Sequence, residues 1–161
     1  MDYDIVYAEK ARNGFGLHTT KALRAGQSIV EIAGRVHHWH ELLRRGGSFL
    51  ENCFRYDEDH YLDPGEGPGR YLNHSCNPNA GIRKEGNALM LYAARSIRTD
   101  EEILIDYSTI TGDDDVWRMY CRCGSRKCRR WITRFALLPP EVKRSYRRRG
   151  LLPEYMLPTL E

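Results

Sequence analysis

Residues 70–79 read Arg-Tyr-Leu-Asn-His-Ser-Cys-Asn-Pro-Asn, a dense run of polar and turn-forming side chains. Ser, Asn and Pro favour turns, and Asn side chains readily bond nearby backbone groups. The run predicts a rigid polar loop that holds a ligand, with an ordinary Asn-rich surface turn as the alternative. The surrounding sequence decides between them: Gly-Phe-Gly at 14–16, Ile-Leu-Ile-Asp-Tyr at 103–107 and a cysteine triplet near the end.

The length and composition predict one folded domain. The chain has 161 residues, of which 41% are hydrophobic, so it can bury a sizeable core and is not expected to be disordered. Its 25 Lys and Arg residues against 22 Asp and Glu give a net charge of +3, which is too balanced to indicate nucleic-acid binding by itself.

Neither a membrane span nor a signal peptide is expected. No apolar run approaches the roughly 20 residues that cross a bilayer, and the first residues lack a basic region followed by an apolar stretch. We therefore expect a reducing compartment, the cytoplasm in a bacterium or the nucleus in a eukaryote. There, five cysteines indicate metal binding or free thiols rather than disulfides.

The pattern of short elements predicts an α+β domain that is mostly β. Strands are expected at 4–7, 28–32, 88–92 and 102–107, a short helix at 39–45 that stops at Gly46-Gly47, and a loop at 63–69. A second helix should begin at Pro139-Pro140 and end at Gly150, with Val142 and Tyr146 facing inward. The expected organisation is a main domain over 1–119, a cysteine module over 120–135 and a helical tail over 136–161.

Cys121, Cys123 and Cys128 lie within eight residues, among basic and small residues that are unlike a protein core. Neighbouring positive charge favours the thiolate, the form that binds metal. Structural zinc takes four Cys or His ligands, so a distant residue has to complete the site. The sequence leaves Cys53, Cys76 and the histidines open as the fourth ligand.

The segment Asn13-Gly14-Phe15-Gly16 resembles a phosphate-binding loop only in part. The dinucleotide pattern needs a third glycine and a following helix, and Leu-His-Thr-Thr at 17–20 is poor helix sequence. The simpler interpretation is a tight turn between strands. Glycine would still allow a ligand to approach the backbone closely.

Taken in order, these segments resemble the SET-domain protein lysine methyltransferases over about residues 3–132. Residues 14–16 look like the first motif of that family, and residues 70–79 match its Arg-Phe-Ile-Asn-His-Ser-Cys-x-Pro-Asn signature almost throughout. Glu-Glu-Ile-Leu-Ile-Asp-Tyr at 101–107 is similar to its Glu-Glu-Leu-x-x-Asp-Tyr motif. The cysteine triplet followed by Arg-Arg-Trp at 129–131 looks like the post-SET zinc module.

The resemblance implies a SET β-clip of small curled sheets, in which the Asn-His and Asp-Tyr segments thread as a pseudoknot, plus the post-SET module and a short C-terminal helix. It implies S-adenosylmethionine as cofactor and a protein lysine, in a histone or another basic protein, as substrate. Zn²⁺ would be held by Cys76, Cys121, Cys123 and Cys128. Tyr107 would be the catalytic residue, and the implied cofactor-binding residues are Asn13, Gly14, Phe15, Gly16, Arg70, Tyr71, Asn73, His74, Tyr107 and Trp131.

Two departures from the family pattern affect what carries over. The family's Tyr-x-Gly motif is Ile32-Ala33-Gly34 here, which removes part of the expected pocket wall. A Phe or Tyr that often stands two residues before the catalytic tyrosine is Ile105, so the number of methyl groups added is left open. No strong general base is evident in the motifs, so water is expected to carry the proton away.

Several features keep a simpler explanation beside the functional one. His37, His38 and His40 could form a second metal site, but a solvated start to a variable insert over 35–51 is favoured. Cys53 is expected to be a buried free thiol. Trp131 either caps the lysine channel or packs the zinc module. The arginine-rich tail is either a solvated helix face or a surface for nucleic acid or acidic partners. A non-catalytic, zinc-stabilised binding module remains the alternative to an enzyme.

Overall fold

The computed structural model describes residues 4–45, 52–112 and 117–156, and these form short strands in five small sheets together with two α-helices. This confirms the mostly β, α+β class. The strands are β1 Val6–Ala11, β2 Gly14–Thr19, β3 Ser28–Glu31, β4 Arg35–His38, β5 Phe54–Arg55, β6 His60–Asp63, β7 Asn73–His74, β8 Ala80–Glu85, β9 Ala88–Ala93, β10 Leu104–Ile105, β11 Met119–Tyr120 and β12 Trp131–Ile132. The helices are α1 Trp39–Arg45 and α3 Pro140–Arg148, with 3-10 turns η1 Pro68–Tyr71, η2 Tyr107–Thr109, η3 Phe135–Leu137 and η4 Glu154–Met156.

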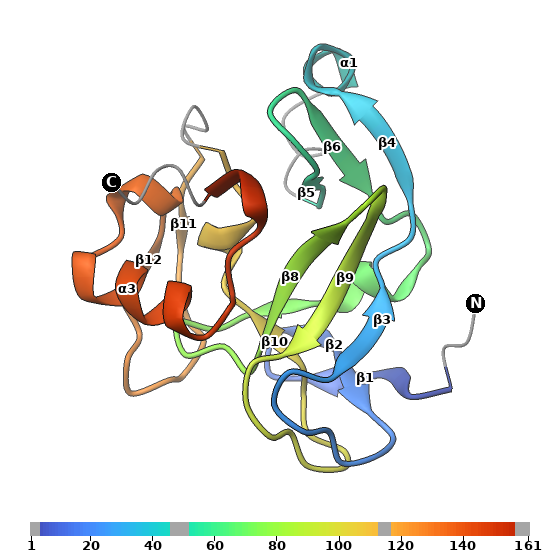
Figure 1. The fold of residues 1–161 in the computed structure, drawn as a ribbon, viewed down its shortest axis with the longest axis vertical. Helices are drawn as coiled ribbons and strands as arrows, with labels where there is room; N and C mark the ends of the chain where they lie inside the picture. The colour runs from blue at the N-terminus through green and yellow to red at the C-terminus, as the bar shows by residue number, and fades with distance from the viewer. Residues whose placement is uncertain (1–3, 46–51, 113–116, 157–161) are drawn as a thin grey trace.

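Three of the sheets are stacked along the long axis of the molecule (Figure 1). The β1–β2 hairpin lies at one end, the antiparallel sheet β3-β9-β8 in the middle, and the sheet β4-β6-β5 with α1 at the other end. β9 alternates buried and half-buried residues, as a strand with one face on the core should. The main hydrophobic core lies among the first two of these sheets and reaches the third through Phe54 and Leu62.

The predicted elements are confirmed where the apolar pattern was clear. The helix at 39–45 and the strands at 28–32 and 88–92 are found within one residue of their expected ends. The strand expected at 4–7 begins instead at Val6 and continues to Ala11, because its whole length pairs with β2. No described helix is long and apolar enough to cross a membrane.

The strand expected at 102–107 was too long. Only Leu104 and Ile105 are in β10, and Tyr107 begins the 3-10 turn η2. The turn forms because the Asp106 carboxylate accepts a hydrogen bond from the Ser108 N–H at 3.0 Å, an N-cap interaction that competes with continued strand.

The parallel pair β7–β10 is the link between the two central motifs. Asn73 lies opposite Leu104, and His74 lies opposite Ile105. The Ser75 N–H then donates to the Ile105 carbonyl at 2.8 Å, and the Leu104 N–H donates to Asn79 Oδ1 at 2.7 Å. Segments 31 residues apart in sequence are thus held side by side, while their threading as a pseudoknot stays a prediction.

The C-terminal helix is docked on the main domain. Val142 and Tyr146 face inward as expected, next to buried Phe135 and Leu138. Gly150 ends the helix with a φ of +62°, and its N–H donates to the Arg147 carbonyl at 3.1 Å while the next N–H donates to the Tyr146 carbonyl at 3.1 Å. The chain then presses on β8, where a Cβ on Gly81 would lie 2.9 Å from the Leu151 Cα.

The expected variable insert over 35–51 is described as far as residue 45. Its residues 46–51 lie outside the described residues, and so does the Gly46-Gly47 pair at which the helix was expected to stop. Residues 35–38 form β4, which pairs with β6 over its whole length. His37 is 2% exposed and its Nδ1 lies 3.2 Å from Glu41 Oε2, so this histidine is not solvated as expected. The boundaries at 119/120 and 135/136 stay predictions; β11 runs across the first.

Candidate functional site

Asn73 connects the signature segment to the glycine motif. Its Nδ2 donates to the Phe15 carbonyl at 3.0 Å and to Glu102 Oε1 at 2.8 Å. One short polar side chain on β7 therefore fixes the edge of β2 and a carboxylate just before β10. This accounts for an amide at this position, because only an amide offers two N–H donors on so short a stem.

Tyr107 lies at the start of η2 with its phenol directed inward. The hydroxyl donates to the Leu72 carbonyl at 2.7 Å, which uses the only proton it has and leaves its oxygen lone pairs for a ligand. Burial, with a smaller contribution from the Glu102 carboxylate, raises the pKa of Tyr107 to about 12. The residue therefore stays a neutral phenol near pH 7, suited to orienting a group rather than to removing a proton.

His74 joins Tyr107 to the cysteine cluster. The Tyr107 N–H donates to His74 Nδ1 at 3.1 Å, which assigns the proton of the neutral ring to Nε2. Nε2 lies 3.3 Å from Cys76 Sγ. Burial lowers the pKa of His74 to about 4, with Asp106 opposing and Arg129 adding to the effect, so the ring is neutral near pH 7.

The thiols form a compact donor set. The ligand atoms of His74, Cys76, Cys121 and Cys123 all lie within 4.8 Å of one another. The Sγ atoms of Cys76 and Cys121 are 3.7 Å apart. Zn–S bonds of about 2.3 Å in a tetrahedron place two sulfurs about 3.8 Å apart, so the spacing fits zinc. The chemistry of the site fits it as well, since thiolates and imidazole are the preferred ligands of this metal.

Cys128 packs against the same cluster, although it is outside the four mutually close atoms. Its Sγ lies 3.7 Å from the Cys121 carbonyl oxygen. Burial opposes ionisation of Cys123, yet hydrogen bonds from backbone groups of Cys76 and Ser125 and from the thiols of Cys121 and Cys128 lower its pKa to about 7. All four expected cysteines therefore gather in one place, with His74 beside them as a fifth donor.

Hydrogen bonding separates the two candidates for the fourth ligand. A neutral imidazole carries one N–H, so Nε2 can bind a metal only when the proton sits on Nδ1. The Tyr107 N–H already points at Nδ1, which leaves Nε2 as the donor to Cys76 Sγ. This arrangement favours His74 as a partner of a metal-bound thiolate and Cys128 as the fourth ligand, which stays a prediction.

A buried ionic network missed by the sequence analysis ties the tail to this site. The Asp106 carboxylate, 1% exposed, accepts from Arg129 Nη2 at 2.7 and 2.9 Å and from the Tyr146 hydroxyl at 2.6 Å. Tyr146 belongs to α3 and Arg129 to the cysteine module. The sequence feature that could have predicted this network is Asp106 itself. A carboxylate between an apolar strand and a tyrosine is expected to be buried, and a buried carboxylate needs partners.

Four of the expected cofactor residues, 13–16, lie at the β1–β2 turn and at the start of β2. The turn at Arg12 and Asn13 connects β1 to β2, as the simpler interpretation of this segment predicted, and Gly14 follows it with a φ of +78°. Phe15 is 62% exposed, which is unusual for so large an apolar side chain and offers a free aromatic face. The Arg12 guanidinium reaches Gly124 of the cysteine module, so that module borders the hairpin.

The remaining expected residues differ in how available they are. Arg70 forms an ion pair with Glu66 and lies 5.5 Å from the centre of the Tyr71 ring. Trp131 is 48% exposed and touches Arg118 and Tyr120, while the neighbouring Ile132, 1% exposed, is the apolar anchor of the cysteine cluster. Trp131 therefore packs against Tyr120 within the module, and a role in capping the lysine channel stays a prediction. Roles in binding a cofactor stay predictions for all of these residues.

Cys53, the histidines near α1 and Ile105 are not among the residues of the cysteine cluster. Cys53 is buried as expected, and burial raises its pKa to about 12. No second group of three metal-binding side chains occurs in residues 4–45, 52–112 and 117–156, so the histidines of β4 and α1 do not form one there. Ile105 is fully buried in the main core.

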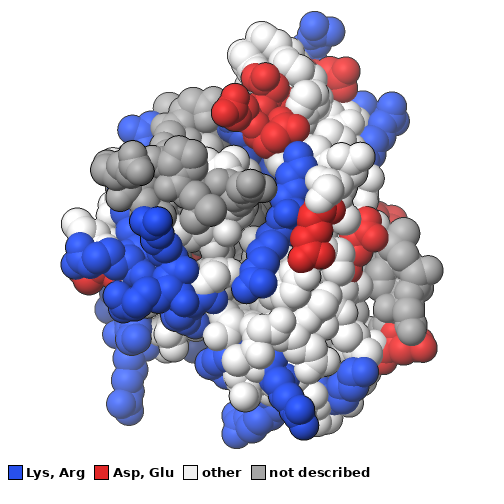
Figure 2. Space-filling model, viewed as in Figure 1, with Lys and Arg blue, Asp and Glu red and all other residues white. Residues whose placement is uncertain are grey.

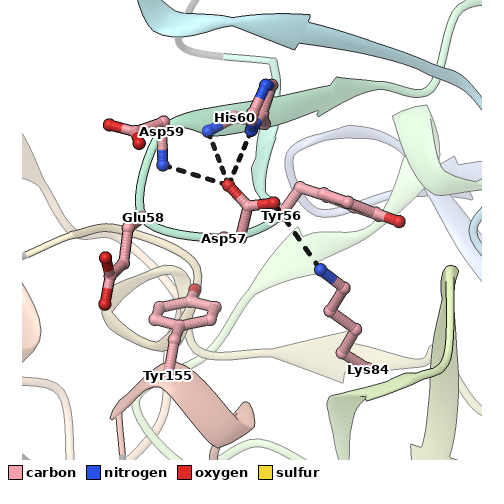
Figure 3. A pocket seen from close by; sticks show the side chains of 7 residues that line it. All are labelled: Tyr56, Asp57, Glu58, Asp59, His60, Lys84 and Tyr155. Carbon is pink, nitrogen blue, oxygen red and sulfur yellow. Dashed lines mark hydrogen bonds and ion pairs between the residues drawn. The ribbon is translucent and has the colours of Figure 1, made fainter.

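A shallow hollow of about 460 Å³ lies apart from these residues (Figure 3). The β5–β6 turn lines it on one side, and Lys84 of β8 and Tyr155 of η4 line the others. Its central carboxylate, Asp57, already pairs with His60 at 2.8 Å and with Lys84 at 3.7 Å. None of the expected site residues contributes to it.

Comparison with known proteins places this site in a family. A family model described as the SET domain matches residues 14–108. A histone-lysine N-methyltransferase, H3 lysine-4 specific, of Cryptococcus neoformans is 31% identical over 147 residues, covering 78% of this chain and 9% of that protein. The protein of the same name in Saccharomyces cerevisiae is 30% identical, covering 80% of this chain and 13% of its own length. Human histone-lysine N-methyltransferase 2D is 30% identical, covering 79% of this chain and 2% of its own length.

The chain thus spans only a small part of the length of these curated relatives. The matched region contains the glycine motif, the signature segment and the Asp-Tyr motif, which the structure brings together through Asn73 and the β7–β10 pair. From this match and this geometry, the chain belongs to the SET domain family.

Proposed function

We propose that this protein is an S-adenosylmethionine-dependent protein-lysine N-methyltransferase. The observation that carries the proposal is the state of the Tyr107 phenol. Its pKa is raised, so it stays neutral near pH 7, and its one proton is donated to the Leu72 carbonyl. Tyr107 follows β10, the strand that pairs with the signature segment. The names of the SET-domain relatives support lysine methylation as the reaction class.

S-adenosylmethionine would supply an electrophilic methyl group on its sulfonium. The exposed Phe15 face, the backbone at Gly14 and Gly16, and the Asn73–His74 strand are the groups that would hold it. Asn13, Arg70, Tyr71 and Trp131 are assigned to its periphery. For Arg70 to contribute, its ion pair with Glu66 has to open, and Glu66 is well exposed.

The protein's own contribution is alignment and control of the lysine proton. At a pKa near 10.4, only about one lysine in 2,500 is neutral at pH 7, and an apolar channel raises that fraction by disfavouring the ammonium. The Tyr107 oxygen can accept a hydrogen bond from the amine and weak contacts from the methyl C–H groups. The lysine ammonium would first lose its proton to water, because only the neutral nitrogen has a lone pair for the methyl group that the cofactor would supply.

Zn²⁺ is assigned to Cys76, Cys121, Cys123 and Cys128, as a structural ion. Its effect on the reaction would be indirect, since Cys76 accepts from His74, which in turn accepts from the Tyr107 backbone. Such a contact outside the ligand shell orients both the ligand and the neighbouring group.

A basic protein segment is the proposed substrate, and the tail of histone H3, including lysine 4, is the first to test because relatives carry that specificity in their names. In a eukaryotic host this substrate would place the protein in the nucleus.

The test is transfer of radiolabel from S-adenosylmethionine to histone H3, other core histones and a cell lysate. We expect labelled protein with the parent chain and at least a hundredfold slower transfer with Tyr107→Phe, whereas Tyr92→Phe, which removes an exposed hydroxyl, should retain activity. Measurable cofactor binding without transfer to any protein would overturn the proposal and favour the non-catalytic binding module.

A further inference from the structure

The charge of the chain is strongly divided, although its sum is small. Residues 117–161 contain 12 Lys and Arg against 3 Asp and Glu, a net of +9, whereas residues 1–116 contain 13 against 19, a net of −6. A local excess of this size creates a field over the C-terminal part that the total of +3 conceals. The basic part comprises the cysteine module and the tail, which the family match at 14–108 does not include.

Helix α3 presents one continuous basic face. Arg144, Arg147 and Arg148 are spaced i, i+3 and i+4, so they lie together, and all three are exposed. Val142 and Tyr146 occupy the opposite face of the helix and pack against the apolar cluster that contains Phe135 and Leu138. No ion pair joins these three arginines to any residue in the described part of the chain, so their charge is not neutralised locally.

The cysteine module adds exposed arginines that flank an aromatic pair. Tyr120 on β11 and Trp131 on β12 are about half exposed and meet edge to face, with ring centres 5.5 Å apart. Arg118 lies 5.4 Å from the Trp131 ring centre, and Arg122 lies 5.8 Å from that of Tyr120. Further exposed cations follow along the same module: Arg126, Lys127 and Arg130.

The two basic elements are fixed against each other. Arg129 Nη1 of the module lies 3.4 Å from the Tyr146 hydroxyl of α3, and both contact the same buried carboxylate of Asp106. Lys and Arg side chains gather on the side of the molecule where α3 and β12 lie, while acidic side chains gather near the β5–β6 turn and on the opposite side (Figure 2).

We propose that this surface, formed by the outer face of α3 and the β11–β12 hairpin, binds single-stranded nucleic acid. The unpaired arginines suit a phosphate backbone, whose charge is complementary to theirs. The exposed Tyr120 ring suits an unstacked base, and aromatic rings interleaved with arginine are the usual platform for single strands. The inference does not depend on methyltransferase activity, since α3 and Tyr120 lie outside the proposed catalytic machinery; Trp131, which meets Tyr120, is the one residue shared with the proposed cofactor site.

The test is fluorescence anisotropy of the zinc-loaded 161-residue chain with labelled oligo(dT) and oligo(U) of 20 nucleotides, from 50 to 300 mM salt. We expect dissociation constants of about 1–100 µM near 150 mM salt and a steep loss of affinity as salt rises. The triple variant Arg144→Gln, Arg147→Gln, Arg148→Gln should reduce the slope of log K against log salt by about 2, since each single-strand phosphate contact contributes about 0.7.

A matched control separates the surface from net charge. The triple variant Lys10→Gln, Lys21→Gln, Arg24→Gln also removes three exposed charges, but from the acidic part of the chain, and should leave the slope unchanged. Tyr120→Ala should weaken binding at least about fivefold at every salt concentration, because it removes a stacking contact rather than a charge.

Three results would overturn the proposal. The first is an equal loss of affinity in the two triple variants, which would indicate net charge alone. The second is an unchanged affinity in Tyr120→Ala with folded protein by circular dichroism, which would exclude base stacking. The third is competition by poly-glutamate as strong as that by oligo(dT) at equal charge, which would indicate an acidic protein surface as the partner.

Discussion

Tyr146→Phe tests whether the C-terminal helix is part of the site or an appendage. The substitution removes one hydroxyl from a residue that is 3% exposed and leaves the ring that packs beside Phe135 and Leu138. The hydroxyl donates to Asp106 Oδ2 at 2.6 Å and lies 3.4 Å from Arg129 Nη1 and from the Cys76 carbonyl. Each of these partners belongs to a different segment, so one atom joins α3 to the Asp-Tyr motif, the cysteine module and the signature.

The loss of folding free energy expected for Tyr146→Phe follows from the charge of Asp106, the acceptor of the lost hydrogen bond. A hydrogen bond to an ionised, buried carboxylate contributes about 1.5–3 kcal/mol, more than a neutral pair, and its removal leaves Asp106 with less compensation for burial. For a chain of this size, 1 kcal/mol corresponds to about 2–4 °C in the midpoint of thermal unfolding, so Tyr146→Phe should lower that midpoint by about 3–12 °C.

The measurement is thermal unfolding by circular dichroism on zinc-loaded protein, with urea unfolding for the free energy. Tyr92→Phe is the matched control, because it also removes a phenol bound to a carboxylate, that of Glu85, but at the surface. Its effect should stay within about 0.5 kcal/mol. If the two variants unfold within 1 °C of each other, the Asp106 network does not hold the helix and the reasoning fails.

Three further predictions follow from the same contacts. Arg129→Met should cost about 3–5 kcal/mol, since it leaves the Asp106 carboxylate buried without its cation, and a urea midpoint equal to that of the parent would contradict this. Cys76→Ser should lower zinc content below the expected one ion per chain and then slow methyl transfer, measured by metal analysis and the label assay, and a full zinc complement would show that Cys76 is not a ligand. Burial raises the pKa of Tyr107 to about 12, so the folded state resists its ionisation and loses stability as pH rises from about 10 to 12. Tyr107→Phe should reduce that loss of stability in unfolding measurements above pH 10. If the free energy of unfolding falls with pH in the variant as it does in the parent, Tyr107 is not the group responsible.

The sequence determined the elements whose signal is local. The helix at 39–45 and the strands at 28–32 and 88–92 follow from apolar spacing, and the end of α3 follows from Gly150, which takes the left-handed conformation that other residues avoid. The sequence also predicted the family. In residues 70–79 and 101–107 the identity of the side chains matches the family motifs, and not only their polarity.

The tertiary structure decided what depends on partners distant in sequence. Tyr107 leaves the expected strand because the Asp106 carboxylate caps a turn, and that carboxylate is buried only because Arg129 and Tyr146 reach it from 23 and 40 residues away. The donor roles of His74 were likewise undetermined, since the tautomer of an imidazole is set by the groups facing its two nitrogens. The sequence by itself specified which chemical groups are present and where single segments bend, whereas proton positions, ion pairs and the docking of α3 depend on long-range contacts that local patterns do not encode.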